Sequence, residues 1–122
     1  MKTVWDTFWK DKGAALEWNQ DDVLKSKNLK KILGIILSHI KKNDLKGTSL
    51  IELGSGIGIT SFYFAKNGAE VTLLDKSKEI IKPSKAYWTN CKKPKFVFSD
   101  VLKFNSDNKY DIVTSFGLCE HF

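Results

Sequence analysis

The chain has 122 residues, of which 42% are hydrophobic and 28% are charged, a composition typical of one globular domain and not of a disordered tail. Its formal net charge is +6, and all 20 of its basic residues are lysines. Because nucleic-acid readers rely on arginine for bidentate contacts with phosphate and guanine, this composition indicates a lysine-rich solvated surface and argues against a nucleic-acid partner.

The cysteines and the apolar segments indicate the compartment. The two cysteines, Cys91 and Cys119, share no CxxC spacing, which fits a reducing environment better than a disulfide framework. The first residues contain no apolar core of a secretory signal, and the longest apolar run, 32–37, is too short to span a membrane. We therefore expect a cytoplasmic protein without a membrane partner.

The N-terminal segment, residues 1–27, is rich in aromatic residues. Three of the four tryptophans, Trp5, Trp9 and Trp18, stand here among charged residues. Such side chains usually pack onto a core, and the alternative is a cover over a ligand. We expect short packing helices or a lid, followed by one domain at residues 28–122.

The domain begins with a helix and continues as an alternation of strands and helices. Apolar residues recur at the helical period from Leu29 to Ile40, and Asn28 is the expected N-cap. Apolar runs bounded by glycine, proline and polar residues then predict strands, and helical patterns separate them. The expected strands are 49–53, 70–75, 95–100 and 110–116, and the expected helices are 57–67 and a segment from Ser77 that starts or kinks at Pro83.

A glycine-rich turn joins the first strand to the helix that follows it. Gly54, Gly56 and Gly58 occupy alternate positions after the acidic Glu52. A turn of this kind lets a ligand approach the backbone closely, and the helix N-terminus is expected to present outward N–H groups. The strand before it and the helix after it favour a cofactor loop over a simple turn.

Acidic residues end the next two strands. Asp75 follows the second strand, where a carboxylate can accept both ribose hydroxyls of a nucleoside. Asp100 follows the third strand, where it could accept a hydrogen bond from an exocyclic adenine amine, with the Val101 backbone nearby. Helix capping is the other role open to Asp75.

The spacing of the glycines separates two nucleoside cofactors. In the dinucleotide fingerprint G-x-G-x-x-G the last glycine would fall at Ile59, and here Gly58 comes one residue earlier. The pattern Glu52-x-Gly54-x-Gly56-x-Gly58 instead resembles motif I of the class I S-adenosylmethionine-dependent methyltransferases. The family's later motifs resemble Leu73-Leu74-Asp75, Ser99-Asp100-Val101 and the segment 110–122, which ends in Glu120-His121-Phe122.

The resemblance implies a cofactor, S-adenosylmethionine, and a role for each matching residue. The backbone of the glycine loop would cradle the methionine portion of the cofactor, and Glu52 would orient the loop or the amino group. Asp75 would hold the ribose, and the adenine and sulfonium would lie against the remaining residues. The implied cofactor-binding set is Glu52, Gly54, Ser55, Gly56, Gly58, Asp75, Lys76, Asp100, Val101, Phe116 and Gly117.

The resemblance also bears on catalysis and on the acceptor. His121 is the one candidate general base, with Glu120 to orient it, although methyl transfer asks mainly for alignment. No metal is expected, because Gly117 stands where the first acid of a metal-binding E-x-x-E-H sequence would be. The fourth strand lacks the proline-containing motif of DNA amino-methyltransferases, so we expect a small-molecule acceptor.

The predicted fold is an α/β, three-layer Rossmann-like sandwich with a mainly parallel sheet that stops after the fourth strand. The resemblance implies three further strands, so the chain is expected to be a fragment, one half of a split enzyme or a minimal module. The exposed edge of the fourth strand would then favour a homo-oligomer or a complementary C-terminal chain. Two other functions stay open, a non-catalytic binding or subunit module and a domain of an NAD- or FAD-binding oxidoreductase.

Overall fold

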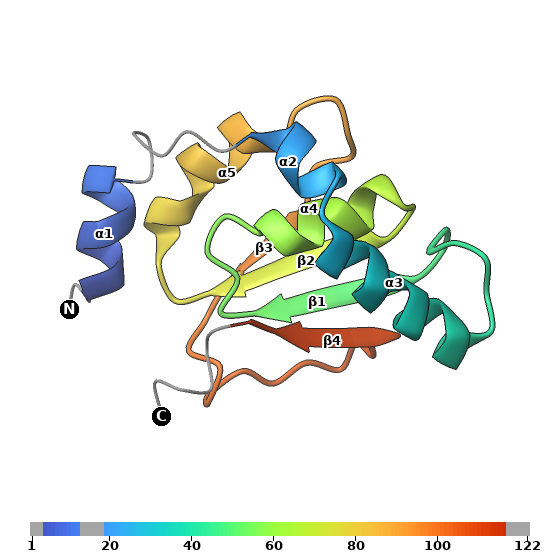
Figure 1. The fold of residues 1–122 in the computed structure, drawn as a ribbon. Helices are drawn as coiled ribbons and strands as arrows, with labels where there is room; N and C mark the ends of the chain where they lie inside the picture. The colour runs from blue at the N-terminus through green and yellow to red at the C-terminus, as the bar shows by residue number, and fades with distance from the viewer. Residues whose placement is uncertain (1–3, 13–18, 117–122) are drawn as a thin grey trace.

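The computed structural model describes residues 4–12 and 19–116, which form a parallel sheet of four strands with helices packed on it (Figure 1). The strand order is β3-β2-β1-β4, and every pair of neighbours is parallel. The α/β class and the Rossmann-like parallel sheet predicted from the sequence are confirmed. The strands are β1 (Ser49–Leu53), β2 (Glu70–Asp75), β3 (Lys95–Phe98) and β4 (Ile112–Ser115).

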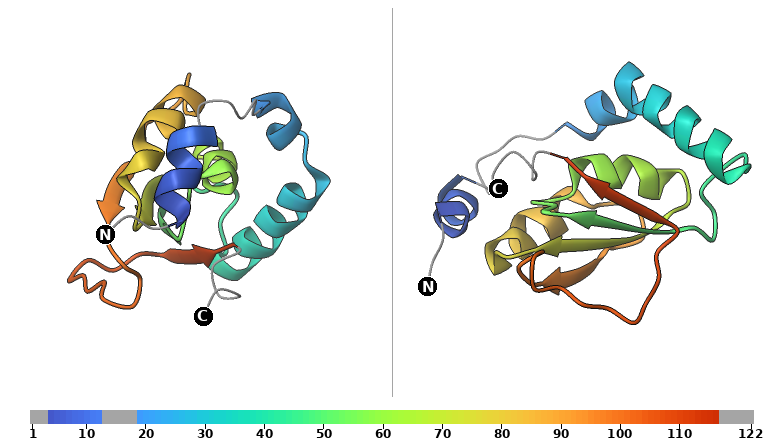
Figure 2. Two further views of the ribbon diagram at one scale, coloured as in Figure 1. Left: turned by 90° about the vertical axis from the view of Figure 1, so that its left-hand side faces the viewer. Right: turned by 90° about the horizontal axis from the view of Figure 1, so that it is seen from below.

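The helices lie mainly on one side of this sheet (Figures 1 and 2). The connection 99–111 between β3 and β4 contains no helix and runs along the other side. Among the described residues, no helix has the length and apolar character needed to cross a bilayer. The helices are α1 (Val4–Lys12), α2 (Gln20–Leu24), α3 (Lys27–Ile40), α4 (Ile59–Lys66), the 3₁₀ turn η1 (Lys78–Ile80) and α5 (Ile81–Tyr87).

The main hydrophobic core lies between the sheet and the helices. Leu50 of β1 pairs with Val71 of β2 and Ile112 of β4, so these three side chains share one face of the sheet. Helix α4 covers that face with Phe62, which is fully buried and makes edge-to-face contacts with the aromatic rings at the end of α5. Removal of this apolar surface from water provides the main driving force that attaches the helices to the sheet.

Helix α3 begins two residues before the predicted start. Its N-cap is Ser26, whose side-chain oxygen accepts a hydrogen bond from the N–H of Leu29 at 3.3 Å. Asn28, the predicted N-cap, lies inside the first turn, so that prediction is wrong. A serine three positions before Leu29 satisfies an unpaired amide that Asn28 could not reach from within the helix.

Strands β3 and β4 are both shorter than predicted, and an aspartate makes hydrogen bonds beside one end of each. Asp100, expected to end the third strand, accepts a hydrogen bond from the N–H of Leu102 at 3.0 Å, and this turn takes the backbone out of the sheet. Asp111 precedes β4 and accepts hydrogen bonds from the backbone N–H and the hydroxyl of Ser49 at 2.8 and 3.2 Å. These hydrogen bonds lower the pKa of Asp111 and fasten the start of β4 to the start of β1.

Pro83 lies in the first turn of α5, where a missing backbone N–H donor costs least. Of the two predicted alternatives, a helix that starts at this proline or a kinked helix, the structure agrees with the first.

Strand β4 forms one edge of the sheet, because it pairs with β1 and with no other strand among the described residues. Val113 of β4 is 60% exposed, which leaves apolar surface on this strand.

The end of α5 is bonded to the glycine loop. The indole Nε1–H of Trp88 donates to the carbonyl oxygen of Ile57 at 2.8 Å, and the hydroxyl of Ser84 donates to the same oxygen at 3.2 Å. Trp88 and Ser84 are both fully buried. A buried carbonyl with two donors is well satisfied, so α5 fixes the position of Ile57 within the loop.

We expect Trp88→Phe to lower the free energy of unfolding by about 1–3 kcal/mol, because it removes a buried donor from the Ile57 carbonyl. Ser84→Ala should cost less, and the double variant should cost more than the sum of the two single changes, since it leaves the carbonyl without a donor. Urea unfolding of the four proteins measures this coupling. Strict additivity would contradict the shared role of the two donors.

Candidate functional site

The parallel strands bring the predicted site residues to one edge of the sheet. The glycine loop, 54–58, follows β1, Asp75 ends β2, and Asp100 stands two residues after β3. Phe116 follows β4 and is 39% exposed. The carboxyl ends of parallel strands are where ligands of open α/β sheets bind. Gly117 and His121 lie outside the described residues, so their roles stay predictions.

The glycine loop is held by hydrogen bonds to the neighbouring strand. The N–H groups of Gly54 and Ser55 both donate to the carbonyl oxygen of Leu74, at 2.8 and 3.1 Å. The N–H of Gly58 donates to the carbonyl of Ser55 within the loop at 3.1 Å. The loop therefore continues the pairing between β1 and β2 beyond the last strand residues.

A side chain bonds the remaining glycine amide. The N–H of Gly56 donates to the Asp75 carboxylate oxygen Oδ2 at 2.9 Å. All three glycine amides thus have acceptors inside the protein. The Gly56 amide is taken because the carboxylate at the end of β2 is close enough to accept from it. The outward N–H groups expected at the N-terminus of the following helix, α4, are a separate set and stay a prediction. Close approach of a ligand to the loop backbone is therefore expected at the half-buried Gly54 and Ser55, since Gly56 is buried.

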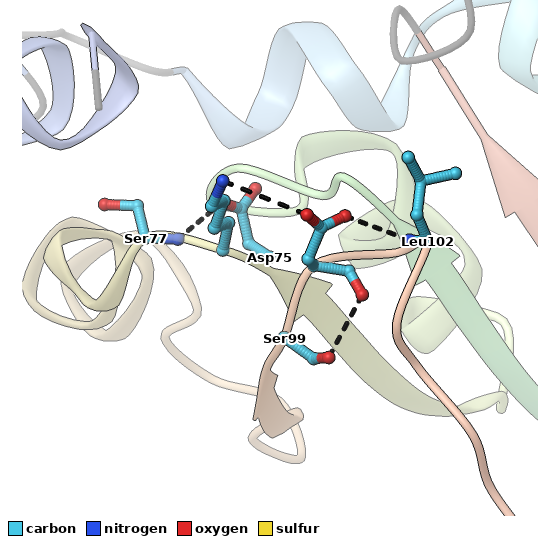
Figure 3. A network of polar contacts seen from close by, with 6 residues as sticks. Asp75, Ser77, Ser99 and Leu102 are labelled. Carbon is cyan, nitrogen blue, oxygen red and sulfur yellow. Dashed lines mark hydrogen bonds and ion pairs between the residues drawn. The ribbon is translucent and has the colours of Figure 1, made fainter. Parts of the chain in front are cut away.

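Asp75 also organises the segment that follows β2. Its second oxygen, Oδ1, accepts a hydrogen bond from the N–H of Ser77 at 3.0 Å (Figure 3). A carboxylate has about four lone-pair sites, so each oxygen keeps room for one further donor. Asp75 is only half-buried, and its carboxylate is able to accept ribose hydroxyls while it braces the loop.

Lys76 and Asp100 meet across the ends of β2 and β3. Lys76 Nζ lies 3.9 Å from Asp100 Oδ2, and the lysine side chain is 62% exposed. An exposed pair at this distance is weak, so it orients the two side chains without fixing them. Ser99 donates its hydroxyl to the carbonyl of Asp100 at 3.1 Å, which stabilises the same turn beside the half-buried Val101 (Figure 3).

Glu52 is a buried carboxylate directly behind the loop. It is 4% exposed, and its Oε1 accepts a hydrogen bond of 2.5 Å from the hydroxyl of Ser61 in the first turn of α4. Burial raises the pKa of Glu52 to about 7, the hydrogen bonds from Ser61 oppose this shift, and the negative charge of Asp75 adds to it. Glu52 can therefore carry or release a proton near neutral pH.

The raised pKa of Glu52 predicts a pH-dependent stability. Both states are protonated below the ordinary pKa of 4.5, and between 4.5 and about 7 the unfolded chain releases a proton that the folded chain keeps. Stability from this group is thus fully present below pH 4.5 and is lost as pH rises to about 7, by on the order of 3 kcal/mol. Glu52→Gln should remove this loss.

Urea unfolding at pH 5 and pH 8 measures the effect. The stability of the wild-type protein relative to Glu52→Gln should fall from pH 5 to pH 8, and groups common to both proteins cancel in the comparison. Equal pH dependence in the two proteins would show that Glu52 titrates normally.

Two separate features of the structure favour glycine at position 58. Its φ is +76°, a left-handed conformation, and it stands at the N-cap of α4. A Cβ at this position would lie 2.7 Å from both Cδ1 and Cδ2 of the buried Leu73. The loop and the core of the sheet are therefore in direct contact at Gly58.

We expect Gly58→Ala to destabilise the fold by about 1–3 kcal/mol, through backbone strain and the contact with Leu73. Gly34 is the matched control, because it lies in α3 and a methyl group added there would have no atom within 4 Å. Gly34→Ala should stabilise the protein by up to about 1 kcal/mol. Thermal melts of both variants give the comparison, and a neutral Gly58→Ala would mean that the loop adopts another conformation.

Several residues of the site were not anticipated from the sequence. Ser61 bonds Glu52, the Leu74 carbonyl receives two loop amides, Trp88 holds Ile57, and Trp9 of α1 lies against Gly56. No local pattern marks these contacts, since each joins segments distant in the chain. Within 4–12 and 19–116, no three His, Cys, Asp or Glu side chains cluster in a way that could hold a metal ion.

The family model described as "Methyltransferase domain" matches residues 50–122, more than half of the chain. The chain therefore belongs to this methyltransferase domain family, in agreement with the class predicted from its motifs. No curated protein matches the chain by sequence.

Solved structures with a similar fold are methyltransferases. The magnesium protoporphyrin IX methyltransferase of Synechocystis PCC 6803, with bound S-adenosylmethionine, has a TM-score of 0.68 at 17% identity over 98% of this chain and 62% of its own. The plantazolicin methyltransferase BpumL, in complex with S-adenosylhomocysteine, gives 0.60 at 22% identity over 90% and 44%. Phosphoethanolamine N-methyltransferase 1 of Haemonchus contortus gives 0.55 at 17% over 89% and 24%. The chain thus spans less than two thirds of each of these proteins.

Proposed function

We propose that the chain binds S-adenosylmethionine at the carboxyl edge of its sheet and serves methyl transfer to a small-molecule acceptor. The observation that carries the proposal is the hydrogen bonding of the glycine loop. Every glycine amide of the loop has an acceptor in the protein, and the acceptor at Gly56 is the carboxylate of Asp75. The family membership and the cofactors bound in the similar structures support the same conclusion.

This loop suits a cofactor without phosphate. A dinucleotide places its pyrophosphate on free N–H groups at a helix N-terminus. Here the N–H of Gly56 in the loop is already occupied, and the Asp75 carboxylate that accepts from it adds negative charge beside the loop. A cofactor with a cationic sulfonium and an ammonium group meets no such repulsion, so the arrangement favours S-adenosylmethionine over NAD or FAD.

The remaining roles in this proposal are those that the resemblance to the methyltransferases implies. Asp75 accepts from the ribose hydroxyls through its spare lone pairs, and Lys76 flanks the adenine. Asp100 and the Val101 backbone bind the adenine edge from the end of β3. Phe116 and Gly117, after β4, border the sulfonium.

S-adenosylmethionine supplies a methyl group that already carries its leaving group, so the chemistry asks the protein for alignment and for exclusion of water. The loop fixes the methionine end, while Asp75 and Asp100 fix the nucleoside end. His121 as a general base and a cytoplasmic location both remain predictions. We propose a small-molecule acceptor because a chain without arginine is poorly suited to bind nucleic acid.

Calorimetric titration of the full chain with S-adenosylmethionine, S-adenosylhomocysteine and NAD tests the proposal. S-adenosylmethionine and S-adenosylhomocysteine should both bind, and NAD should not. Asp75→Asn should weaken binding of S-adenosylhomocysteine by roughly 10- to 100-fold, because a charged acceptor of the ribose is lost. Thermal melts of the same samples show whether the variant keeps its fold.

Asp107→Asn is the matched control, since it makes the same charge change in the exposed part of the connection 99–111. This variant should bind as the wild-type chain does. The absence of heat with either sulfur cofactor, or equal affinities for Asp75→Asn and Asp107→Asn, would overturn the proposal.

A further inference from the structure

Trp9 of α1 lies directly on the glycine loop. A Cβ added to Gly56 would lie 2.6 Å from Cζ2 and 3.1 Å from Cη2 of the Trp9 indole. The six-membered part of the ring is therefore in contact with the backbone at Gly56, and no larger residue fits there without moving it. Gly56 is buried although it has no side chain.

Helix α1 lies beyond the carboxyl ends of β1 and β2, at the edge of the sheet where the predicted site residues gather (Figure 1). It also contacts η1, the turn that follows Asp75 and Ser77. One helix thus touches both the loop after β1 and the segment after β2. These are the two segments between which the proposed cofactor binds.

The indole is oriented by its neighbours on the same helix. Phe8 packs edge-to-face on Trp9 with ring centroids 4.9 Å apart, and Trp5 packs edge-to-face on Phe8 at 5.8 Å. The outer part of α1 stays open to solvent, since Val4 is 77% exposed and Trp5 is 45% exposed. The helix therefore rests on the site through Trp9 and η1 and is not enclosed by the domain.

We propose that α1 covers the cofactor site and that Trp9 is the positioning residue that closes it against Gly56. The inference rests on the proposed binding of S-adenosylmethionine. A large aromatic surface seated on the loop shields this edge of the sheet from water and holds a bound cofactor against the backbone. The cofactor then leaves only when α1 moves, so Trp9 acts mainly on the rate of dissociation.

Binding of S-adenosylhomocysteine to Trp9→Ala, Trp9→Phe and Val4→Ala tests the cover. Trp9→Ala should raise Kd by roughly 3- to 10-fold, the size of a lost aromatic contact, mostly through a faster dissociation rate. Trp9→Phe should fall between Trp9→Ala and the wild type. Val4→Ala removes apolar surface from the exposed part of the same helix, and should change Kd by less than about twofold.

The outcomes distinguish the proposal that α1 covers the site from the proposal that the chain binds S-adenosylmethionine. If the wild type and Val4→Ala bind, Asp75→Asn binds weakly and Trp9→Ala binds normally, the cover is wrong and the proposed function stands. Tighter binding by Trp9→Ala would also overturn it, because the indole would then be an obstruction. No binding by the wild type overturns both proposals. If Trp9→Ala fails to fold, the dissociation rate of Trp9→Phe decides by the same criterion.

Discussion

The carboxylate of Asp75 determines how the rest of the site is built. Pairing between β1 and β2 ends with Leu53 opposite Leu74, and beyond it the Leu74 carbonyl and then Asp75 take the amides of the loop. The same carboxylate bonds the N–H of Ser77, so one side chain fixes the turns after two neighbouring strands. The carboxylate also places a negative charge beside Gly56 of the loop. The Asp75 carboxylate therefore contributes both to the geometry of the loop and to the cofactor selectivity that we propose for it.

The loop is held from three sides by residues outside it. Asp75 and Leu74 bond it from β2, Trp88 and Ser84 bond it from α5, and Trp9 lies on it from α1. Behind it, Glu52 and Ser61 form a buried polar pair. An isolated glycine-rich turn would be among the most flexible parts of a chain, because glycine loses the most conformational freedom on folding. Here the surrounding contacts supply the rigidity that the glycines lack.

The sequence was sufficient to predict the class of fold, the four strands and the residues at their ends. Those features are local, because apolar runs of strand length and glycines at a strand–helix junction can be recognised without knowing what packs on them. The N-cap of α3 was predicted wrongly, because two polar side chains stand near the helix start and the local pattern does not say where the first turn begins. Ser26 caps α3 in place of Asn28.

Other features could not be predicted because they depend on distant parts of the chain. The pKa of Glu52 is set by burial under α4, and the contact between Trp9 and Gly56 joins residues on separate elements. Tryptophans in the N-terminal segment fit either simple packing or a cover until the position of α1 is known. The class of cofactor was predictable from the resemblance of the glycine loop and the later motifs to the methyltransferases, while the hydrogen bonding of the loop was not.

The order of these contacts along the chain has a consequence for folding during synthesis. The residues that hold the loop in place, from Trp9 to Trp88, all precede β3 and β4 in the sequence. A chain made from its N-terminus thus gives the loop every described partner before β3 and β4 leave the ribosome. Of the four described strands β4 is made after the others, and until then the outer edge of β1 has no partner strand among the described residues.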